Sequence, residues 1–231
     1  MAVGIRTVGA EQGEAASGRA APRGFSRLAA YATGKEILIV GPSSAGKTKF
    51  SQYLILGALD AEDTREMTYQ ITKSGVFVIR IGAQGHLALK VRRAVDTPGQ
   101  VGPIQHASLV GRRKPHGVIV MLDSTKAVST SVRWLRLFCD RLDTVLRKGS
   151  YGRTKLSGFL VLLNKRDKVN NSESSELKES VQEVLGRYLS VVLGADRVSS
   201  IPILECVSVQ TKRGSALIDE VINQLAAQLT R

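Results

Sequence analysis

Eight consecutive residues in the first quarter of the chain combine glycine, lysine and threonine at a spacing suited to binding phosphate. They match the pattern GxxxxGK[ST] at every fixed position and read Gly41-Pro42-Ser43-Ser44-Ala45-Gly46-Lys47-Thr48. The glycines permit backbone conformations in which successive amide groups point inward at an anion. Lys47 can bridge two phosphates of a nucleotide, and the Thr48 hydroxyl can bind Mg²⁺. The motif alone does not separate ATP from GTP.

The segments on either side of this phosphate loop (residues 41–48) have the context that the motif requires. The apolar run Ile37–Val40 precedes the loop and predicts a buried strand, and Lys47–Leu56 follows as a predicted helix. The N-terminus of a helix carries a partial positive charge, which favours bound phosphate. We therefore include Lys49, in the first turn of that helix, among the predicted nucleotide-binding residues.

A second polar motif, Asn164-Lys165-Arg166-Asp167, directly follows the apolar run Phe159–Leu163. A carboxylate at Asp167 can accept two hydrogen bonds, from the N1–H and the exocyclic amine of guanine. Adenine offers neither donor and would leave the acid unpaired, at a cost of roughly 1–3 kcal/mol per unsatisfied group. In combination with the phosphate loop, we interpret Asn164, Lys165 and Asp167 as residues that recognise guanine.

Two further motifs complete a set of four. Asp96-Thr97-Pro98-Gly99-Gln100 follows the predicted strand Leu87–Val95 and matches the pattern DxxG. Ser208-Val209-Gln210-Thr211-Lys212 follows the last predicted strand. Ligands of parallel sheets bind at the carboxyl ends of strands, so all four motifs are predicted to meet at one edge.

On these four motifs, the chain from about residue 37 to residue 229 resembles the small GTPases of the Ras, Arf and signal-recognition-particle-receptor beta group. The resemblance implies that Asp96 holds Mg²⁺ through water and that the Gly99 amide senses the γ-phosphate of GTP. It assigns Gln100 to orienting the attacking water, so Gln100 and Lys47 are the predicted catalytic residues. His106 lies a few residues on, where we expect a loop histidine without a catalytic role.

The same resemblance assigns Ser208, Val209 and Gln210 to the SAK box, which leans on the guanine ring through backbone amides. It also implies that a threonine between the first helix and the second strand binds Mg²⁺ when GTP is bound. The likeness of Ile71-Thr72-Lys73-Ser74 to the Arf and receptor-beta pattern favours Thr72, and Thr68 is the second choice. As an alternative, these threonines are ordinary strand-forming residues.

The sequence departs from the family at three places. The last box reads SVQ in place of SAK, which leaves the packing of Gln210 on the base open. Ser43 occupies a position that is glycine in Ras, where bulk obstructs an arginine finger. The arm at residues 1–34 has no counterpart in Ras, and it lacks the membrane anchor usual in the receptor beta subunit.

The leading hypothesis is a nucleotide-dependent molecular switch that selects an effector protein. Slow intrinsic hydrolysis then implies a GTPase-activating or exchange partner. The alternative is a GTP-holding structural or docking subunit with little turnover. Asn164 and Asp167 argue against a kinase or ATPase with the same phosphate loop. A GTPase associated with the ribosome or RNA is motivated by charge alone.

The chain carries a net charge of +13, and residues 111–170 hold most of it, with fourteen basic and four acidic residues. One interpretation is a solvated face with the helical pairs Arg136–Asp140 and Asp143–Arg147. The other is contact between residues 111–155 and an anionic surface. Aromatic residues make up only 5%, too few for a platform that stacks nucleic-acid bases, so a membrane surface or acidic protein is favoured over RNA.

The apolar pattern predicts an α/β fold of the P-loop NTPase type. We expect a mostly parallel sheet of about six strands, one antiparallel edge strand and helices on both faces. The predicted strands are 37–40, 76–81, 87–95, 117–122, 159–163 and 201–207, with a hairpin turn at 82–85. The predicted helices are 47–56, 129–147, 174–192 and 216–229. Residues 1–34 form a separate arm, largely disordered with one short helix, and residues 35–231 form the GTPase domain.

The remaining features concern location. No apolar run approaches the ~18 residues of a membrane span, and the N-terminus lacks a signal-peptide core. Cys139 and Cys206 lie in apolar segments and are predicted to be buried and unpaired rather than joined in a disulfide. The sequence thus predicts a cytoplasmic protein, or one peripheral at a membrane.

Overall fold

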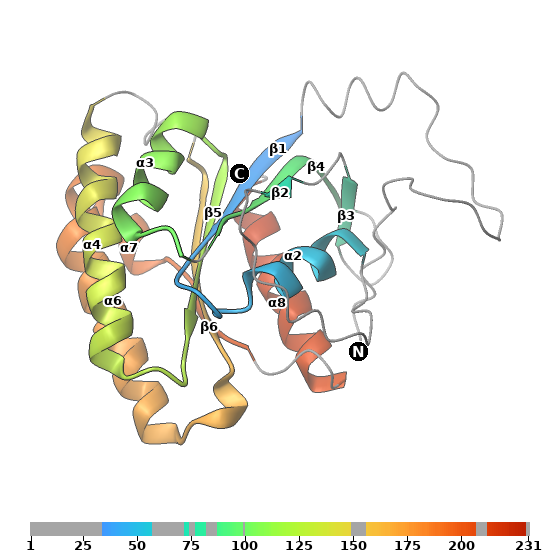
Figure 1. Cartoon of the computed structure of the whole chain (residues 1–231). Helices are drawn as coiled ribbons and strands as arrows, with labels where there is room; N and C mark the ends of the chain where they lie inside the picture. The colour runs from blue at the N-terminus through green and yellow to red at the C-terminus, as the bar shows by residue number, and fades with distance from the viewer. Residues whose placement is uncertain are drawn as a thin grey trace, which may run out of the picture.

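A computed structural model describes most of the chain (Figure 1). It covers residues 34–56, 72–73, 77–81, 87–98, 100–148, 156–206 and 212–229. The predicted N-terminal arm, the turn at 82–85, Thr68, Gly99 and the last box at 208–210 lie outside the described residues.

The described strands form one sheet around a parallel centre. Their bounds are β1 Lys35–Val40, β2 Thr72–Lys73, β3 Phe77–Ile81, β4 Leu87–Asp96, β5 Gly117–Asp123, β6 Gly158–Asn164 and β7 Ile203–Glu205. Their order is β2-β4-β1-β5-β6-β7, with β3 also paired to β4. The pairs β4–β1, β1–β5, β5–β6 and β6–β7 are parallel. The α/β class with a parallel sheet is therefore confirmed.

The sheet edge beside β4 holds more strands than the sequence predicts. β2 and β3 both pair antiparallel with β4, where the prediction has a single antiparallel edge strand. The described residues hold seven strands in place of about six, because the two-residue β2 is too short to leave a hydrophobic pattern.

Helices cover both faces of the sheet (Figure 1). Their bounds are α2 Lys47–Leu56, α3 Pro103–Arg113, α4 Val128–Arg147, α6 Asn171–Leu193, α7 Ala195–Ser199 and α8 Lys212–Leu229, with a 3₁₀ turn, η1, at Arg166–Lys168. Strand β1 shows the two layers: Leu38 and Val40 pack with α3, α4 and α6, and Ile37 and Ile39 pack with α2 and α8. Strands buried on both faces need continuous apolar runs, which is why β1, β5 and β6 are visible in the sequence.

Helix α3 is absent from the sequence prediction, which treats the residues after Gln100 as a loop. The helix has the usual start signals, with Pro103 in its first turn and Gly102 as the preceding residue. It buries Ala107 and Val110 against the core and ends at Arg113, followed by Lys114, whose backbone is left-handed. The prediction also lacks α7 and extends β7 beyond its three residues.

The cysteine prediction is confirmed, because Cys139 and Cys206 are both buried and neither is in a disulfide. Among the described residues, no helix combines the length and apolar character needed to cross a membrane.

Candidate nucleotide-binding site

The phosphate loop connects β1 to α2, as the sequence predicts, and its backbone has the conformation that glycine allows. Gly41 has φ 150°, Ser44 has φ 62° and Gly46 has φ 94°. A Cβ atom on Gly41 would lie 2.1 Å from the Met121 carbonyl oxygen, so no larger residue can stand there without movement of β5. The two fixed glycines of the motif are therefore required by this backbone.

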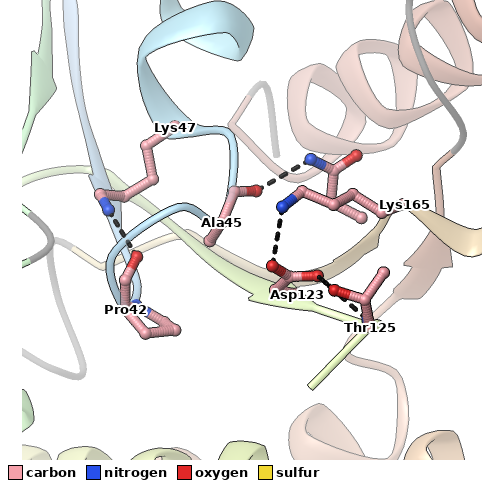
Figure 2. Close-up of polar contacts among 7 residues, drawn as sticks. Pro42, Ala45, Lys47, Asp123, Thr125 and Lys165 are labelled. Carbon is pink, nitrogen blue, oxygen red and sulfur yellow. Dashed lines mark hydrogen bonds and ion pairs between the residues drawn. The ribbon is translucent and has the colours of Figure 1, made fainter. Parts of the chain in front are cut away.

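The lysine of the motif is buried and contacts the loop itself. The Lys47 side chain is 5% exposed, and its Nζ donates a hydrogen bond to the Pro42 carbonyl at 2.8 Å (Figure 2). Thr48 and Lys49 are half-buried in the first turn of α2. The phosphate loop and the first turn of α2 thus carry a cation, a hydroxyl and the start of a helix, which are groups that stabilise bound phosphate.

The phosphate loop and the second motif are in direct contact. Asn164, the last residue of β6, donates from Nδ2 to the Ala45 carbonyl at 2.8 Å. A Cβ atom on Gly46 would lie 2.3 Å from the same Nδ2. Two motifs more than a hundred residues apart in the chain therefore form one site, and the glycine is needed for their close approach.

Beyond Asn164 the chain turns sharply into η1. Lys165 adopts a left-handed backbone with φ 65°, and Asp167 lies exposed on η1. The Arg166 N–H donates to the Cys206 carbonyl at 3.0 Å, which ties this turn to the end of β7. Arg166 also forms an ion pair with Glu205, with 3.3 Å between Nε and Oε2. We call residues 164–168 the base turn.

Asp123 is a polar residue of the site that the sequence prediction overlooks. It is 1% exposed at the end of β5, in register with Asn164 on β6. Lys165 Nζ donates to Asp123 Oδ2 at 2.7 Å, and Thr125 donates to Oδ1 from its amide at 3.0 Å and its hydroxyl at 2.7 Å (Figure 2). The signal was an acid directly after the apolar run 117–122, the position at which β5 reaches the same edge.

The electrostatics of Asp123 follow from these contacts. Burial acts to raise the pKa of its carboxyl group, because the charged form loses water. The hydrogen bonds from Lys165 and Thr125 outweigh that effect, so the pKa lies below its usual value. Asp123 is therefore a carboxylate at neutral pH.

The DxxG segment is fixed to the core at its middle residues. The Thr97 side chain is fully buried, and its hydroxyl donates to the Ile39 carbonyl on β1 at 2.9 Å. Asp96 ends β4 and lies opposite Thr72 in the antiparallel pair with β2. The backbone thus brings together two of the three predicted metal-binding residues, while their side chains lie outside the description. Gln100 is exposed in the turn before α3.

His106 lies in a helix and not in the loop that the sequence predicts. It lies on α3, fully buried, with Nε2 3.2 Å from the Pro98 carbonyl and its ring 5.6 Å from that of Trp134. Its Nδ1 atom has no partner in the described part of the structure. Burial, and less strongly the Lys47 ammonium, lower the pKa of His106 to about 4, against the opposing effect of the Pro98 hydrogen bond.

Of the comparisons with known proteins, only the one with solved structures finds similar proteins. No protein-family model matches the chain. No curated protein matches it either. Among solved structures, it is similar to a bacterial selenocysteine-specific elongation factor, EF-Sec, with 16% identity, a TM-score of 0.48 and coverage of 85% of this chain and 28% of that one.

A second similar structure is the translation elongation factor SelB from Methanococcus maripaludis, solved in complex with the GTP analogue GppNHp. It shares 16% identity at a TM-score of 0.49, with 82% of this chain and 33% of that one covered. The chain therefore spans no more than a third of the length of either protein.

Proposed function

We propose that this protein binds guanine nucleotides as a P-loop GTPase and acts as a nucleotide-dependent switch with slow intrinsic hydrolysis. The observation that carries the proposal is the hydrogen bond between Asn164 and Ala45, which joins the phosphate loop to the base turn. A nucleotide has a phosphate end and a base end. A site with a loop for each, in fixed contact, suits that shape.

In this proposal the phosphate end holds the triphosphate and Mg²⁺. The amides of residues 41–46 and the Lys47 ammonium would hold the phosphates once Nζ exchanges the Pro42 carbonyl for a phosphate oxygen. Hydroxyl and carboxylate oxygens are the ligands that Mg²⁺ prefers. Thr48, Asp96 and Thr72 supply them, and the register of β2 and β4 supports this set. Bound Mg²⁺ would neutralise charge on the phosphates.

In this proposal the base end binds guanine in preference to adenine. Asp167 is exposed on η1, and its carboxylate can meet the two donors of a guanine edge. Lys165 and Asn164 lie next to it on the base turn and hold the turn to Asp123 and to the phosphate loop. Gln100 is exposed beside the DxxG segment, where it can orient a water molecule.

A GTP-holding docking subunit is the second candidate. It is favoured by the buried hydrogen bonds that fix Thr97 to β1 and Pro98 to α3, because a segment anchored in this way resists rearrangement. Either role needs a partner protein, namely an effector together with a GTPase-activating or exchange factor for a switch, and a docked protein for a platform.

Titration of labelled GDP, GTP and ATP, with and without Mg²⁺, tests nucleotide binding. We expect GDP and GTP to bind, Mg²⁺ to strengthen GTP binding, and excess ATP to leave bound GDP in place. Lys47→Ala should abolish binding, whereas Lys178→Ala, on α6 away from the site, should not change it. Equal affinity for ATP and GTP, or no binding of either, would contradict the proposal.

Single-turnover hydrolysis of bound GTP separates the two roles. A switch turns over slowly but measurably, and Gln100→Leu should slow it at least tenfold, because the attacking water loses its orienting amide. A docking subunit keeps GTP for hours with or without the substitution. If Gln100→Leu hydrolyses as fast as the parent, the role assigned to Gln100 is wrong.

A further inference from the structure

The end of β5 and the residue after it are joined to the base turn by two hydrogen bonds. The Ser124 N–H donates to the Asn164 carbonyl at 2.9 Å, and Asp123 accepts from Lys165 Nζ at 2.7 Å. One bond holds the backbone where the turn begins, and the other holds the side chain of the next residue. Figure 2 shows Asp123 lying between Lys165 and Thr125.

The geometry of Lys165 indicates what the carboxylate does there. Its left-handed backbone is uncommon for a residue with a side chain, so something outside the turn must hold it. Its side chain is 29% exposed, and water would compete for its ammonium group if no buried acceptor were available. Asp123 is that acceptor, and both of its oxygens are occupied by Lys165 and Thr125.

A buried carboxylate is costly unless it is paired and hydrogen-bonded. An apolar residue would fill the end of a buried strand at lower cost if packing were the only need. The acid is in register with the residue that joins the base turn to the phosphate loop, and its charge partner is the next residue. Its position therefore serves the turn rather than the core.

We propose that Asp123 is a positioning residue for the base end of the nucleotide site, acting through Lys165 to hold Asn164 and Asp167 in place for guanine. Thr125 fixes the carboxylate from the other side and is part of the same device. The inference rests on the proposed function and adds a residue that none of the four motifs contains.

The test begins with Asp123→Asn, which keeps the size of the side chain and removes its charge. We expect the GDP dissociation constant to rise about tenfold, because the charge-assisted bond to Lys165 is lost. Inosine diphosphate, which lacks the exocyclic amine that Asp167 is proposed to bind, should lose less affinity than GDP, because it has one contact fewer to lose when Asp167 moves. Asp143→Asn, an acid paired with Arg147 on α4, is the matched control and should leave GDP binding unchanged.

A double-mutant cycle with Lys165→Met separates positioning from a merely structural effect. If Asp123 acts through Lys165, then adding Asp123→Asn to Lys165→Met weakens GDP binding no further. Additive losses, or an unaltered GDP affinity of a folded Asp123→Asn protein, overturn the inference. If Asp123→Asn does not fold, Thr125→Val replaces it in the same cycle, with an expected two- to threefold loss that again vanishes in Lys165→Met.

Guanine-nucleotide binding by the parent protein distinguishes failure of the proposed function from failure of the role of Asp123. If it binds no guanine nucleotide, the proposed function fails and the role of Asp123 fails with it. If it binds GDP and the cycle is additive, the nucleotide site stands and Asp123 is only part of the core.

Discussion

His106 lies wholly inside the molecule, between the DxxG segment and the aromatic side chains of α4. Its neutral ring donates from Nε2 to the Pro98 carbonyl, and its ring packs on Trp134, which in turn stacks on Phe138 at 5.4 Å. A positive charge on this ring would have no water and would face the Lys47 ammonium. The residue therefore sets a lower limit on the pH at which this part of the fold is stable.

The pH dependence can be worked out with its sign. Unfolded histidine takes up a proton near pH 6.5, whereas folded His106 does so at about 4, so between these values the unfolded state binds more protons. The contribution of His106 to the free energy of unfolding is fully present above pH 6.5. It falls by about 1.4 kcal/mol per pH unit down to about pH 4. Urea unfolding at pH 7.5, 6.5 and 5.5 should show this loss, and His106→Gln should flatten it. If the pH dependence of stability persists in His106→Gln, it arises from other titrating groups.

Asp167 offers a second test at the scale of one residue. Asp167→Asn replaces an acceptor by an amide that donates, which suits a purine with a carbonyl at C2 in place of the amine. We expect GDP affinity to fall roughly a hundredfold, or about 3 kcal/mol, and xanthosine diphosphate to bind better than GDP. Competition between the two nucleotides measures the change. Retained preference for GDP would show that Asp167 does not contact the base.

At the scale of elements, α3 and α4 approach closely at a glycine. A Cβ atom on Gly111 would lie 2.4 Å from Val145 Cγ1, whereas a Cβ atom on Gly186 of α6 would meet nothing within 4 Å. Both glycines lie inside helices, where alanine is the better helix former. The same substitution should therefore have opposite effects at the two positions.

Gly111→Ala should destabilise the fold by about 1–3 kcal/mol, because overpacking between α3 and α4 exceeds the gain in helix propensity. Gly186→Ala should stabilise it by about 0.5–1 kcal/mol. Thermal unfolding of both variants beside the parent measures the difference. Equal stabilisation would mean that α3 and α4 are further apart than the structure shows.

The elements also show what sequence can and cannot predict. β5 and β6 are buried on both faces and α4 carries a regular apolar stripe, so these are visible as patterns. α3 was missed because its position after the DxxG motif suggested a loop, although Gly102 and Pro103 signal a helix start. α6 begins three residues earlier than predicted, where Asn170 caps it by accepting from the Glu173 N–H at 2.8 Å.

The candidate site likewise contains residues that the sequence reveals and residues that only the folded structure reveals. The phosphate loop and Asn164 are predictable because their spacing is fixed by local backbone geometry. Asp123 is a single acid whose role depends on the register of β5 with β6, and that register exists only in the folded sheet. The burial of His106 likewise comes from packing between helices, which the residues next to it in the sequence do not reveal.

At the scale of the whole molecule, the positive charge of the described residues falls partly on ion-paired and partly on exposed side chains. Arg113 forms a partly buried ion pair with Glu36 at 2.8 Å, and Arg147 pairs with Asp143 at 2.6 Å, one of the two helical pairs predicted. Arg112, Arg133 and Arg136 are exposed on α3 and α4. These exposed residues belong to the basic segment 111–155 and can meet an anionic partner.

We expect the protein to sediment with vesicles that contain phosphatidylserine and to dissociate as salt rises from 50 to 300 mM. Arg133→Gln with Arg136→Gln should weaken this binding severalfold, and Lys178→Gln on α6 is the control. An RNA gel shift over the same salt series should give weaker binding. If neither surface binds the parent, the basic residues form a solvated face.

The contact between Asn164 and Ala45 joins residues 119 positions apart, and this separation has a consequence during synthesis. The phosphate loop leaves the ribosome long before β6 exists, so a nascent chain can grip at most the tail of a nucleotide. In the proposed function, discrimination between purines would arise only once translation has passed the base turn. A nucleotide that binds the finished fold and not the growing chain would then stabilise the completed sheet.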